Sequence, residues 1–222
     1  MADHTYKLSE IPKKQLLGHF WEYYKIPAII TVVVGVIVCW LIYSVFLAPS
    51  PDTSIIFVSS NAVTSDSLEK LEEELYEAAY DYNDDKKNLI DFNTNIIDSS
   101  TEIDLELYAA AKEKLIVMLA MDSHIIQIVD EPMFNFLKEE ELIGTYADFR
   151  GYETGAPVNS DVKIPLSELE FFKESPELLN NDFYLTIRDR ESSHIEGSKK
   201  KTQNYENHLD MFARIAGFKK IG

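Results

Sequence analysis

Three short polar stretches hold the residues of this chain that are best placed to do chemistry. Each one follows an apolar run, and together they comprise Ser59, Ser60 and Asn61, then Asp98, Ser99 and Ser100, and then Asp130, Glu131 and Pro132. Hydroxyl, amide and carboxylate oxygens can hold a ligand, and paired carboxylates can transfer protons as general acid and base. Because 38 of the 222 residues are acidic, adjacent carboxylates are also expected by chance.

Asp130 and Glu131 have a second interpretation, as the start of a helix. Asp is a favoured N-cap, and its carboxylate meets the positive end of the helix dipole. Pro132 suits the first helical turn, because its missing N–H needs no partner there. A helix is expected from about 131 to 138. We therefore expect Asp130 and Glu131 mainly to start this helix and not to perform chemistry.

Other patterns that would indicate chemistry are incomplete. The chain has no G-x-S-x-G, P-loop, G-x-G-x-x-G or H-E-x-x-H motif. Asp81, Asn83 and Asp85 begin like a calcium loop, but Lys86 stands where Gly is needed and Phe92 where Glu is needed. The five histidines are scattered and are expected at surfaces or caps: His4, His19, His124, His194 and His208. The sequence thus predicts no enzyme activity, no metal site and no cofactor.

The elements that position the polar stretches follow a β-α-β-α-β order. Apolar runs predict strands at 53–61, 88–98 and 124–129, and helical spacing predicts helices at 66–82 and 101–122. Crossovers of this length imply parallel strands with right-handed connections. The first strand is the most apolar and is expected at the centre of the sheet. The fold class predicted is a three-layer α/β domain with a mostly parallel sheet, whose polar strand ends meet at one edge, where open α/β sheets bind ligands.

The second half of the chain has weaker patterns. Residues 139–180 contain several Gly and Pro residues and predict loops and short helical turns. Residues 182–190 alternate apolar with polar side chains and predict a half-buried strand, with Phe183, Leu185 and Ile187 toward the core. A helix is expected from 204 to a stop at Gly217, and the three lysines at 199–201 are expected in a solvated loop.

A transmembrane helix is predicted at residues 26–47. These 22 residues contain no charge and span roughly 33 Å as a helix, against a hydrocarbon core of about 30 Å. Aromatic residues flank both ends, as in membrane-interface belts: Phe20, Trp21, Tyr23, Tyr24, Trp40 and Tyr43. A cleaved signal peptide fits poorly, because its apolar region is shorter and ends at small residues. Cys39, the only cysteine, follows Val38 and so lacks the small residue that a lipidated cysteine requires.

The charges that flank this segment predict its orientation. Lys13, Lys14 and Lys25 precede it, and no Lys or Arg follows until Lys70. The positive-inside rule therefore places the N-terminus in the cytoplasm and the C-terminal domain outside the cell. The predicted organisation is a cytoplasmic juxtamembrane helix at 1–25, the membrane helix at 26–47, a linker at 48–52 and an extracellular α/β domain at 53–222.

Charge is divided unequally between these parts. The chain has a formal net charge of −17, and residues 1–48 contain four lysines against three acidic residues, so the remainder carries −18. An acidic surface of this size repels nucleic acid and anionic lipid headgroups. We therefore expect no nucleic-acid partner, and a solvated acidic surface or a basic protein partner instead.

Residues 53–150 resemble the first lobe of the extracellular solute-binding proteins of ABC importers. The resemblance lies in "IIFVSS", the helix after it, "NLIDFNTNIID", the long helix, and "HIIQIVDEPMFNFLKEEELIGTY", where an acidic residue ends the third strand. It implies a lobe of the periplasmic-binding-protein fold, an ABC transporter permease as partner, and ligand contacts near Ser59, Ser60, Asn61, Asp130 and Glu131. The membrane segment with "FWEYYK" before it is similar to single-pass proteins of Gram-positive bacteria.

Two departures from that family shape the functional hypotheses. Solute-binding proteins enclose their ligand between two lobes, and only about 70 residues follow position 150 here. The anchor is a transmembrane helix and not a lipidated cysteine. The first hypothesis is a membrane-anchored, non-enzymatic outer domain that acts through protein contacts, as an accessory subunit of a transporter or another membrane complex. The alternative is solute binding at the strand edge, with a second lobe supplied by a dimer or a partner.

Overall fold

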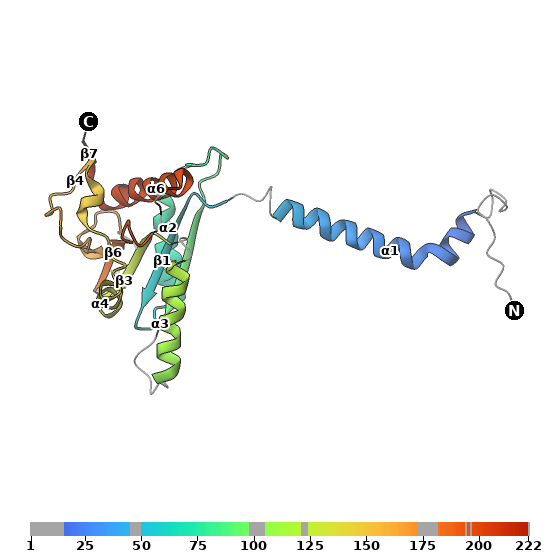
Figure 1. Ribbon diagram of the computed structural model, residues 1–222, viewed down its shortest axis with the longest axis horizontal. Helices are drawn as coiled ribbons and strands as arrows, with labels where there is room; N and C mark the ends of the chain where they lie inside the picture. The colour runs from blue at the N-terminus through green and yellow to red at the C-terminus, as the bar shows by residue number, and fades with distance from the viewer. Residues whose placement is uncertain are drawn as a thin grey trace. The chain divides into compact units, whose positions relative to one another are not determined.

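The computed structural model describes residues 16–44, 50–97, 105–120, 124–172, 182–193, 195 and 197–221 (Figure 1). Contacts divide the chain into two compact units, Met1–Pro49 and Ser50–Gly222. The stretch at 98–100 lies outside the described residues.

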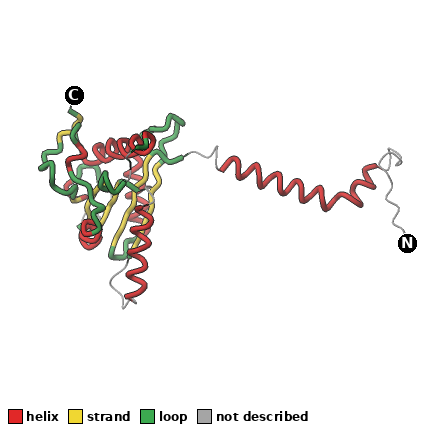
Figure 2. Tube along the Cα trace, in the orientation of Figure 1, coloured by secondary structure: helices red, strands yellow, loops and turns green. Residues whose placement is uncertain are grey.

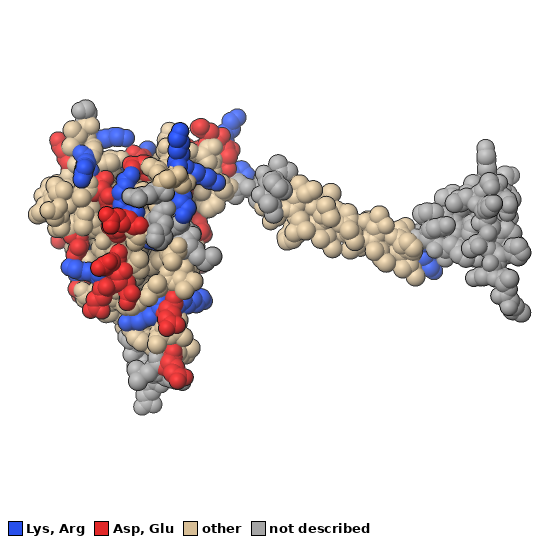
Figure 3. All heavy atoms as spheres, in the orientation of Figure 1, with Lys and Arg blue, Asp and Glu red and all other residues tan. Residues whose placement is uncertain are grey.

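The first unit contains helix α1, Leu16–Ile42. Its segment Lys25–Ile42 is long and apolar enough to cross a membrane by length and composition, and none of it is buried. Residues 26–42 contain no Asp, Glu, Lys or Arg, and the side of the helix seen in Figure 3 is accordingly free of red and blue between its ends. Pro27 lies inside the helix and cannot donate a backbone hydrogen bond, while the Thr31 hydroxyl donates to the Pro27 carbonyl at 2.9 Å.

The second unit is built on a five-stranded sheet with the order β2-β1-β3-β6-β5 (Figure 2). The strands are β1 (Thr53–Ser59), β2 (Ile90–Ile96), β3 (Ile126–Asp130), β5 (Ile164–Pro165) and β6 (Phe183–Ile187). β1 is parallel to both β2 and β3, whereas β6 is antiparallel to both β3 and β5. All strands except β6 therefore run in one direction. The prediction of a mostly parallel sheet is confirmed. The prediction that the first strand lies at the centre is wrong, because β6 and β5 extend the sheet beyond β3, which places β3 at the centre and β1 next to the edge strand β2.

Helices cover both faces of this sheet and make three layers. On one face, α2 (Ser65–Glu77) and α6 (Lys199–Ala216) contribute apolar side chains to a core that contains Ile55 and Phe57 of β1. On the other face, α3 (Leu105–Ala120) and α4 (Glu131–Glu139) pack around Ile56 and Val58. Successive residues of β1 thus alternate between two cores, which explains why its sequence is continuously apolar.

Strand β6 is buried on both faces, so the prediction of a half-buried strand is wrong. On the polar side of β6, Thr186 is fully buried and Tyr184 is half-buried, and Arg188, the residue after the strand, is 1% exposed. The reason is that β6 lies inside the sheet between β3 and β5, with its polar face on the same side as α3 and α4. The alternating pattern identified the strand but not the layer that covers its polar side.

The C-terminal helix is longer than its apolar spacing predicted. α6 begins at Lys199, so the three lysines form its first turn and not a loop. The Ser198 hydroxyl caps it by accepting a hydrogen bond from the Lys201 N–H. The stop at Gly217, which has a left-handed φ of 70°, is confirmed. The helix start was missed because its first turn is solvated and has no apolar periodicity.

Short strands complete the domain. β5 has two residues, and β4 (Tyr152–Glu153) pairs with β7 (Lys219–Lys220) in a separate ribbon. The predicted loops and turns of residues 139–180 include two 3-10 turns, Tyr146–Phe149 and Leu166–Glu168. Two-residue strands carry no readable alternation, so the sequence did not indicate them.

Candidate functional site

The candidate site lies where the carboxyl ends of β1 and β3 meet. Val58 of β1 pairs with Val129 of β3, so the residues that follow both strands are neighbours. This is a topological switch point of the sheet. The chain goes from β1 to β2 on one side, and β3 then lies on the other side of β1. The structure brings together all five predicted ligand-contact residues, Ser59, Ser60, Asn61, Asp130 and Glu131.

Asp130 joins the end of β1 to the start of α4. Its Oδ2 accepts hydrogen bonds from the Ser60 N–H at 2.5 Å and the Ser60 hydroxyl at 2.6 Å, and lies 3.2 Å from the Ser59 hydroxyl oxygen. Its Oδ1 accepts from the Met133 N–H at 3.1 Å, as an N-cap does. The predicted role of Asp130 at the start of a helix is confirmed. The side chain is 6% exposed, so these donors replace water around the carboxylate.

A hollow of about 300 Å³ opens beside Asp130, and the groups that line it disfavour anions. The start of α4 offers few free N–H groups, because Pro132 has none and the Met133 N–H is already bound by Asp130. Acidic side chains contribute to the wall as well. The lining residues are Asn61, Ala62, Val63, Asp130, Glu131, Pro132, Asp182 and Phe183. The hollow is therefore suited to a neutral or cationic group.

Glu131 belongs to a polar cluster to which the second half of the chain contributes Lys163 and Tyr184. Lys163 Nζ lies 2.5 Å from Glu131 Oε2, 4.1 Å from the centre of the Tyr184 ring and 4.6 Å from that of Phe134. The Asn135 amide also donates to Glu131, at 3.3 Å. The hydrogen bond from Lys163 lowers the pKa of the Glu131 carboxyl, which keeps it ionised at neutral pH.

Tyr184 is the other titratable member of this cluster. Burial and its hydrogen bond to Glu131 raise the pKa of Tyr184 to about 12, so the phenol keeps its proton and donates. Neither group is poised to exchange protons near neutral pH. Sequence reasoning missed Lys163, which lies in a segment without periodicity. Tyr184 was recognised only as the polar side of a strand.

A second polar cluster lies near the start of β1 and corrects the prediction for His208. This histidine is 1% exposed and not at the surface. Its Nε2 accepts a hydrogen bond from the Ser54 N–H at 2.8 Å, and its Nδ1 donates to the Asn204 carbonyl at 2.7 Å. Burial lowers the pKa of His208 to about 4, so the ring is neutral. His124 is also buried, and burial lowers its pKa as well.

Ser54 and His208 resemble a nucleophile and its general base, but the histidine nitrogen is not free to take the serine proton. Ser54 Oγ lies 3.1 Å from His208 Nε2. The only lone pair of that nitrogen already accepts the Ser54 backbone N–H. Ser54 is itself 6% exposed, so a substrate cannot reach its hydroxyl. This cluster attaches α6 to the sheet.

A larger hollow of about 700 Å³ lies between α2 and the end of α6. Five glutamates, Lys70 and Arg214 supply its charged lining, and the glutamates are Glu73, Glu74, Glu77, Glu168 and Glu170. An excess of carboxylates attracts cationic groups. Among the described residues, however, no group of three or more His, Cys, Asp or Glu side chains could hold a metal ion.

The loop that begins like a calcium site binds its own backbone. Asp81 accepts hydrogen bonds from the N–H groups of Asp85 and Lys86, at 3.2 and 2.8 Å, and Asn83 accepts from Asp85 at 2.9 Å. Lys86 has a left-handed φ of 66°, at the position where such loops need Gly. These contacts stabilise a tight turn between α2 and β2.

No family model, curated protein or solved structure matches this chain, so the resemblance to a solute-binding lobe stays a prediction.

Proposed function

We propose that this chain is a single-pass membrane protein whose α/β domain lies outside the cytoplasm and acts by contacting other proteins, not by catalysis. The observation that carries the non-catalytic part is the Asp130 carboxylate. It is the central acidic group of the strand edge, and the domain's own N–H and O–H groups already surround it. A carboxylate bound in this way supports the structure and has little freedom to accept a proton from a substrate.

The anchor in this proposal is α1. The segment Lys25–Ile42 is suited to a membrane by length and composition. Lys13, Lys14 and Lys25 favour a cytoplasmic N-terminus, because the next basic residue is Lys70. The domain begins soon after this segment along the chain. Ser50 already belongs to it, because the Ser50 carbonyl accepts a hydrogen bond from the Asn83 side chain at 3.0 Å. A domain held near the bilayer is well placed to contact other membrane proteins.

Within this proposal the protein is an accessory subunit of a transporter or another membrane complex. The sequence resemblance of residues 53–150 makes an ABC transporter permease the first candidate partner. A parallel sheet that begins with β2-β1-β3 and has helices on both faces is compatible with that resemblance.

One observation favours solute binding as a second candidate function. The hollow of about 300 Å³ lies at the edge where open α/β sheets bind ligands. A neutral or cationic solute would contact the side chains of Asn61, Glu131 and Asp182 there. Since the hollow is open, a second lobe from another chain would have to cover it.

Affinity capture of the full chain from membranes in mild detergent tests the main proposal. The matched control is a tagged chain that retains residues 1–49 and lacks the domain. We expect the full chain to recover membrane proteins that the control does not recover, and we expect Glu131→Gln to recover the same proteins. Identical recovery by the full chain and the control would contradict a contact function for the domain. Loss of recovery with Glu131→Gln would move the function to the strand-edge hollow.

A further inference from the structure

The five-stranded sheet ends in two very different edges. At one edge, β5 has only two residues, and one of them is Pro165. At the other edge, β2 has seven residues, each paired with its own residue of β1. Natural proteins protect exposed edges with short strands, Pro, Lys or bulges, because an unprotected edge pairs with other strands. The sequence IDFNTNI of β2 contains no Pro and no Lys, and Asp91 is its one charged residue, so within the described part of the chain little protects this edge.

Backbone groups of β2 alternate between β1 and the outside. The Leu89 carbonyl accepts from the Asp52 N–H at 2.8 Å, and the Ile97 N–H donates to the Ser59 carbonyl at 2.8 Å. The backbone N–H and C=O groups of odd-numbered residues in this segment therefore point toward β1. Those of even-numbered residues point to the outer side of the sheet.

The free outer groups belong to three residues. The Ile90 carbonyl accepts a hydrogen bond from the Tyr76 hydroxyl at 3.4 Å, which occupies the first outward position. Within the part of the chain that the structure describes, the outward N–H and C=O groups of Phe92, Thr94 and Ile96 have no hydrogen-bond partner. These three residues are arranged symmetrically about Thr94.

We propose that two copies of this chain pair through their β2 strands, antiparallel and centred on Thr94, to form one continuous sheet. In this register Thr94 of one copy lies opposite Thr94 of the other. Phe92 of each copy lies opposite Ile96 of the other copy. Each of these opposed pairs exchanges two backbone hydrogen bonds, as directly opposite residues of this class do in antiparallel sheets. All free outer groups of Phe92, Thr94 and Ile96 are then satisfied.

Side chains also match in this register. Aromatic residues opposite β-branched residues, and Thr opposite Thr, are favourable cross-strand pairs. Asp91 is the only charged residue of β2, and it faces Ile97 of the second copy. The two Asp91 carboxylates are therefore about six residues apart along the ladder, roughly 20 Å, beyond the Debye length of about 8 Å at physiological salt. The strand thus avoids direct charge repulsion when it pairs with itself.

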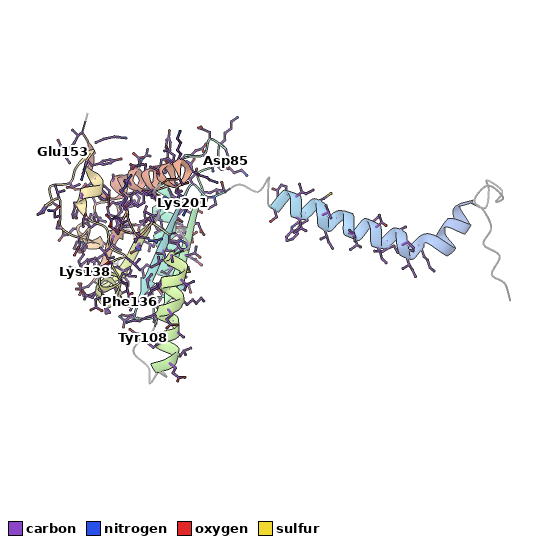
Figure 4. All side chains as sticks on the ribbon, viewed as in Figure 1. Asp85, Tyr108, Phe136, Lys138, Glu153 and Lys201 are labelled. Atoms are coloured by element: carbon purple, nitrogen blue, oxygen red, sulfur yellow. The ribbon has the colours of Figure 1, made fainter. Side chains whose placement is uncertain are left out.

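Two exposed apolar side chains belong to this edge, Ile96 of β2 and Tyr76 of α2, whose hydroxyl donates to the Ile90 carbonyl. In the described residues of the domain, the exposed large apolar side chains are Tyr76, Tyr80, Ile96, Leu107, Val117, Val158 and Ile221. All of these except Val158 and Ile221 belong to β2, to α3, or to α2 and the residues just after it. Lys112 Nζ of α3 lies 4.8 Å from the ring centre of Tyr108 on the same helix and 4.2 Å from that of Phe136 on α4. Figure 4 labels the two aromatic residues. Leu107 and Val117 remain 66% and 59% exposed.

This inference rests on the sheet edge alone and not on the proposed function, so each can fail without the other. Light scattering of the full chain in detergent measures the number of 25.5 kDa chains per micelle. We expect two chains for the wild type and one for Thr94→Lys, which places two ammonium groups side by side at the symmetry axis. Val158→Lys adds the same charge at an exposed site away from β2 and should leave two. A single wild-type chain per micelle, or an undiminished dimer for Thr94→Lys, would overturn the proposal.

Disulfide cross-linking in membranes tests the register and does not depend on a destabilising substitution. In a Cys39→Ala background, Thr94→Cys places two cysteines opposite each other at a Cα distance of about 5.5 Å, within the range of a disulfide. Asn93→Cys is the matched control, because Asn93 faces Asn95 of the second copy in this register. We expect mild oxidation to link the Thr94→Cys chains and to leave the Asn93→Cys chains separate. Linkage of Asn93→Cys with none for Thr94→Cys, or no linkage of either, would overturn the proposed pairing.

Discussion

Asp130 differs from an ordinary N-cap because both of its carboxylate oxygens have partners. As an N-cap alone it should tolerate Asn, which caps about as well. An Asn at this position has only one side-chain oxygen. If that oxygen accepts from the Met133 N–H, the amide NH2 group faces the Ser60 N–H, and if it accepts from Ser60, the Met133 N–H is left without an acceptor. We expect Asp130→Asn to lower the free energy of unfolding by about 1–3 kcal/mol, as for a buried donor left unsatisfied.

Denaturant unfolding of the full chain in detergent measures this loss. The matched control is Ser198→Asn at the start of α6, where the hydroxyl serves as the N-cap. This control should change stability by less than about 0.5 kcal/mol. An Asp130→Asn variant as stable as the Ser198→Asn variant would show that the bonds to Ser60 contribute nothing beyond the cap.

His208 gives the domain a pH-dependent stability. Burial lowers the pKa of His208 from its ordinary value of 6.5 to about 4. Between these two values the unfolded chain binds a proton that the folded chain does not bind. The free energy of unfolding should therefore be highest above pH 6.5 and fall as the pH decreases, by about 3 kcal/mol at pH 4 and below. His124 shifts in the same direction and adds to the slope.

Melting temperatures of the wild type and His208→Gln between pH 4 and 8 check this assignment. Gln does not titrate, and its side-chain oxygen can accept the Ser54 N–H in place of Nε2. The variant should lose less stability on acidification than the wild type does. Equal losses in the two proteins would exclude His208 as the source of the pH dependence.

The residue-scale features were only partly predictable from the sequence. Asp130 at the start of α4 followed from local rules, because a cap bonds to a residue three positions away. Its bonds to Ser60 cross 70 positions and depend on which strands are neighbours. His208 is a different case, because it lies three residues after Tyr205 and four before Phe212, on the buried face of α6. The helical spacing already contained that signal.

At the scale of elements, Arg188 connects β6 to the end of α3. Its guanidinium donates to the carbonyl oxygens of Leu119 and Ser192, and its Nε lies 3.3 Å from the Ser192 hydroxyl. Leu119 is in the last turn of α3, where the helix dipole favours a positive charge. A lysine cannot reproduce the planar fork of donors. We expect Arg188→Lys to lower the free energy of unfolding by about 2–4 kcal/mol, because the single ammonium of Lys cannot make all the hydrogen bonds of the buried guanidinium and leaves carbonyl oxygens without a donor.

Arg190 provides the control for this prediction on the same segment. It is partly exposed and forms a surface ion pair with Glu206 at 3.0 Å. Arg190→Lys should change stability by less than about 1 kcal/mol in the same unfolding experiment. Similar effects of the two substitutions would contradict a special role for the buried guanidinium.

The first half of the sheet was predictable and the second half was not, for a physical reason. β1 and β3 are buried on both faces, and their crossover helices have long apolar stripes. These features leave strong patterns in the sequence. β5 has two residues, and the partners of β6 are set by long-range packing. Its antiparallel direction therefore became visible only in the structure.

For the whole protein, we propose that α1 holds the α/β domain at the outer face of a membrane. Thiol labelling of intact cells with a membrane-impermeant maleimide tests it most directly, in a Cys39→Ala background. Val158→Cys reports on the domain, since Val158 is 57% exposed, and Ala2→Cys reports on the N-terminus. We predict that Val158→Cys is labelled in intact cells, that Ala2→Cys is labelled only after lysis, and that both chains stay in the membrane fraction after an alkaline wash. Protection of Val158→Cys in intact cells, or release of the protein by the wash, would contradict this membrane topology.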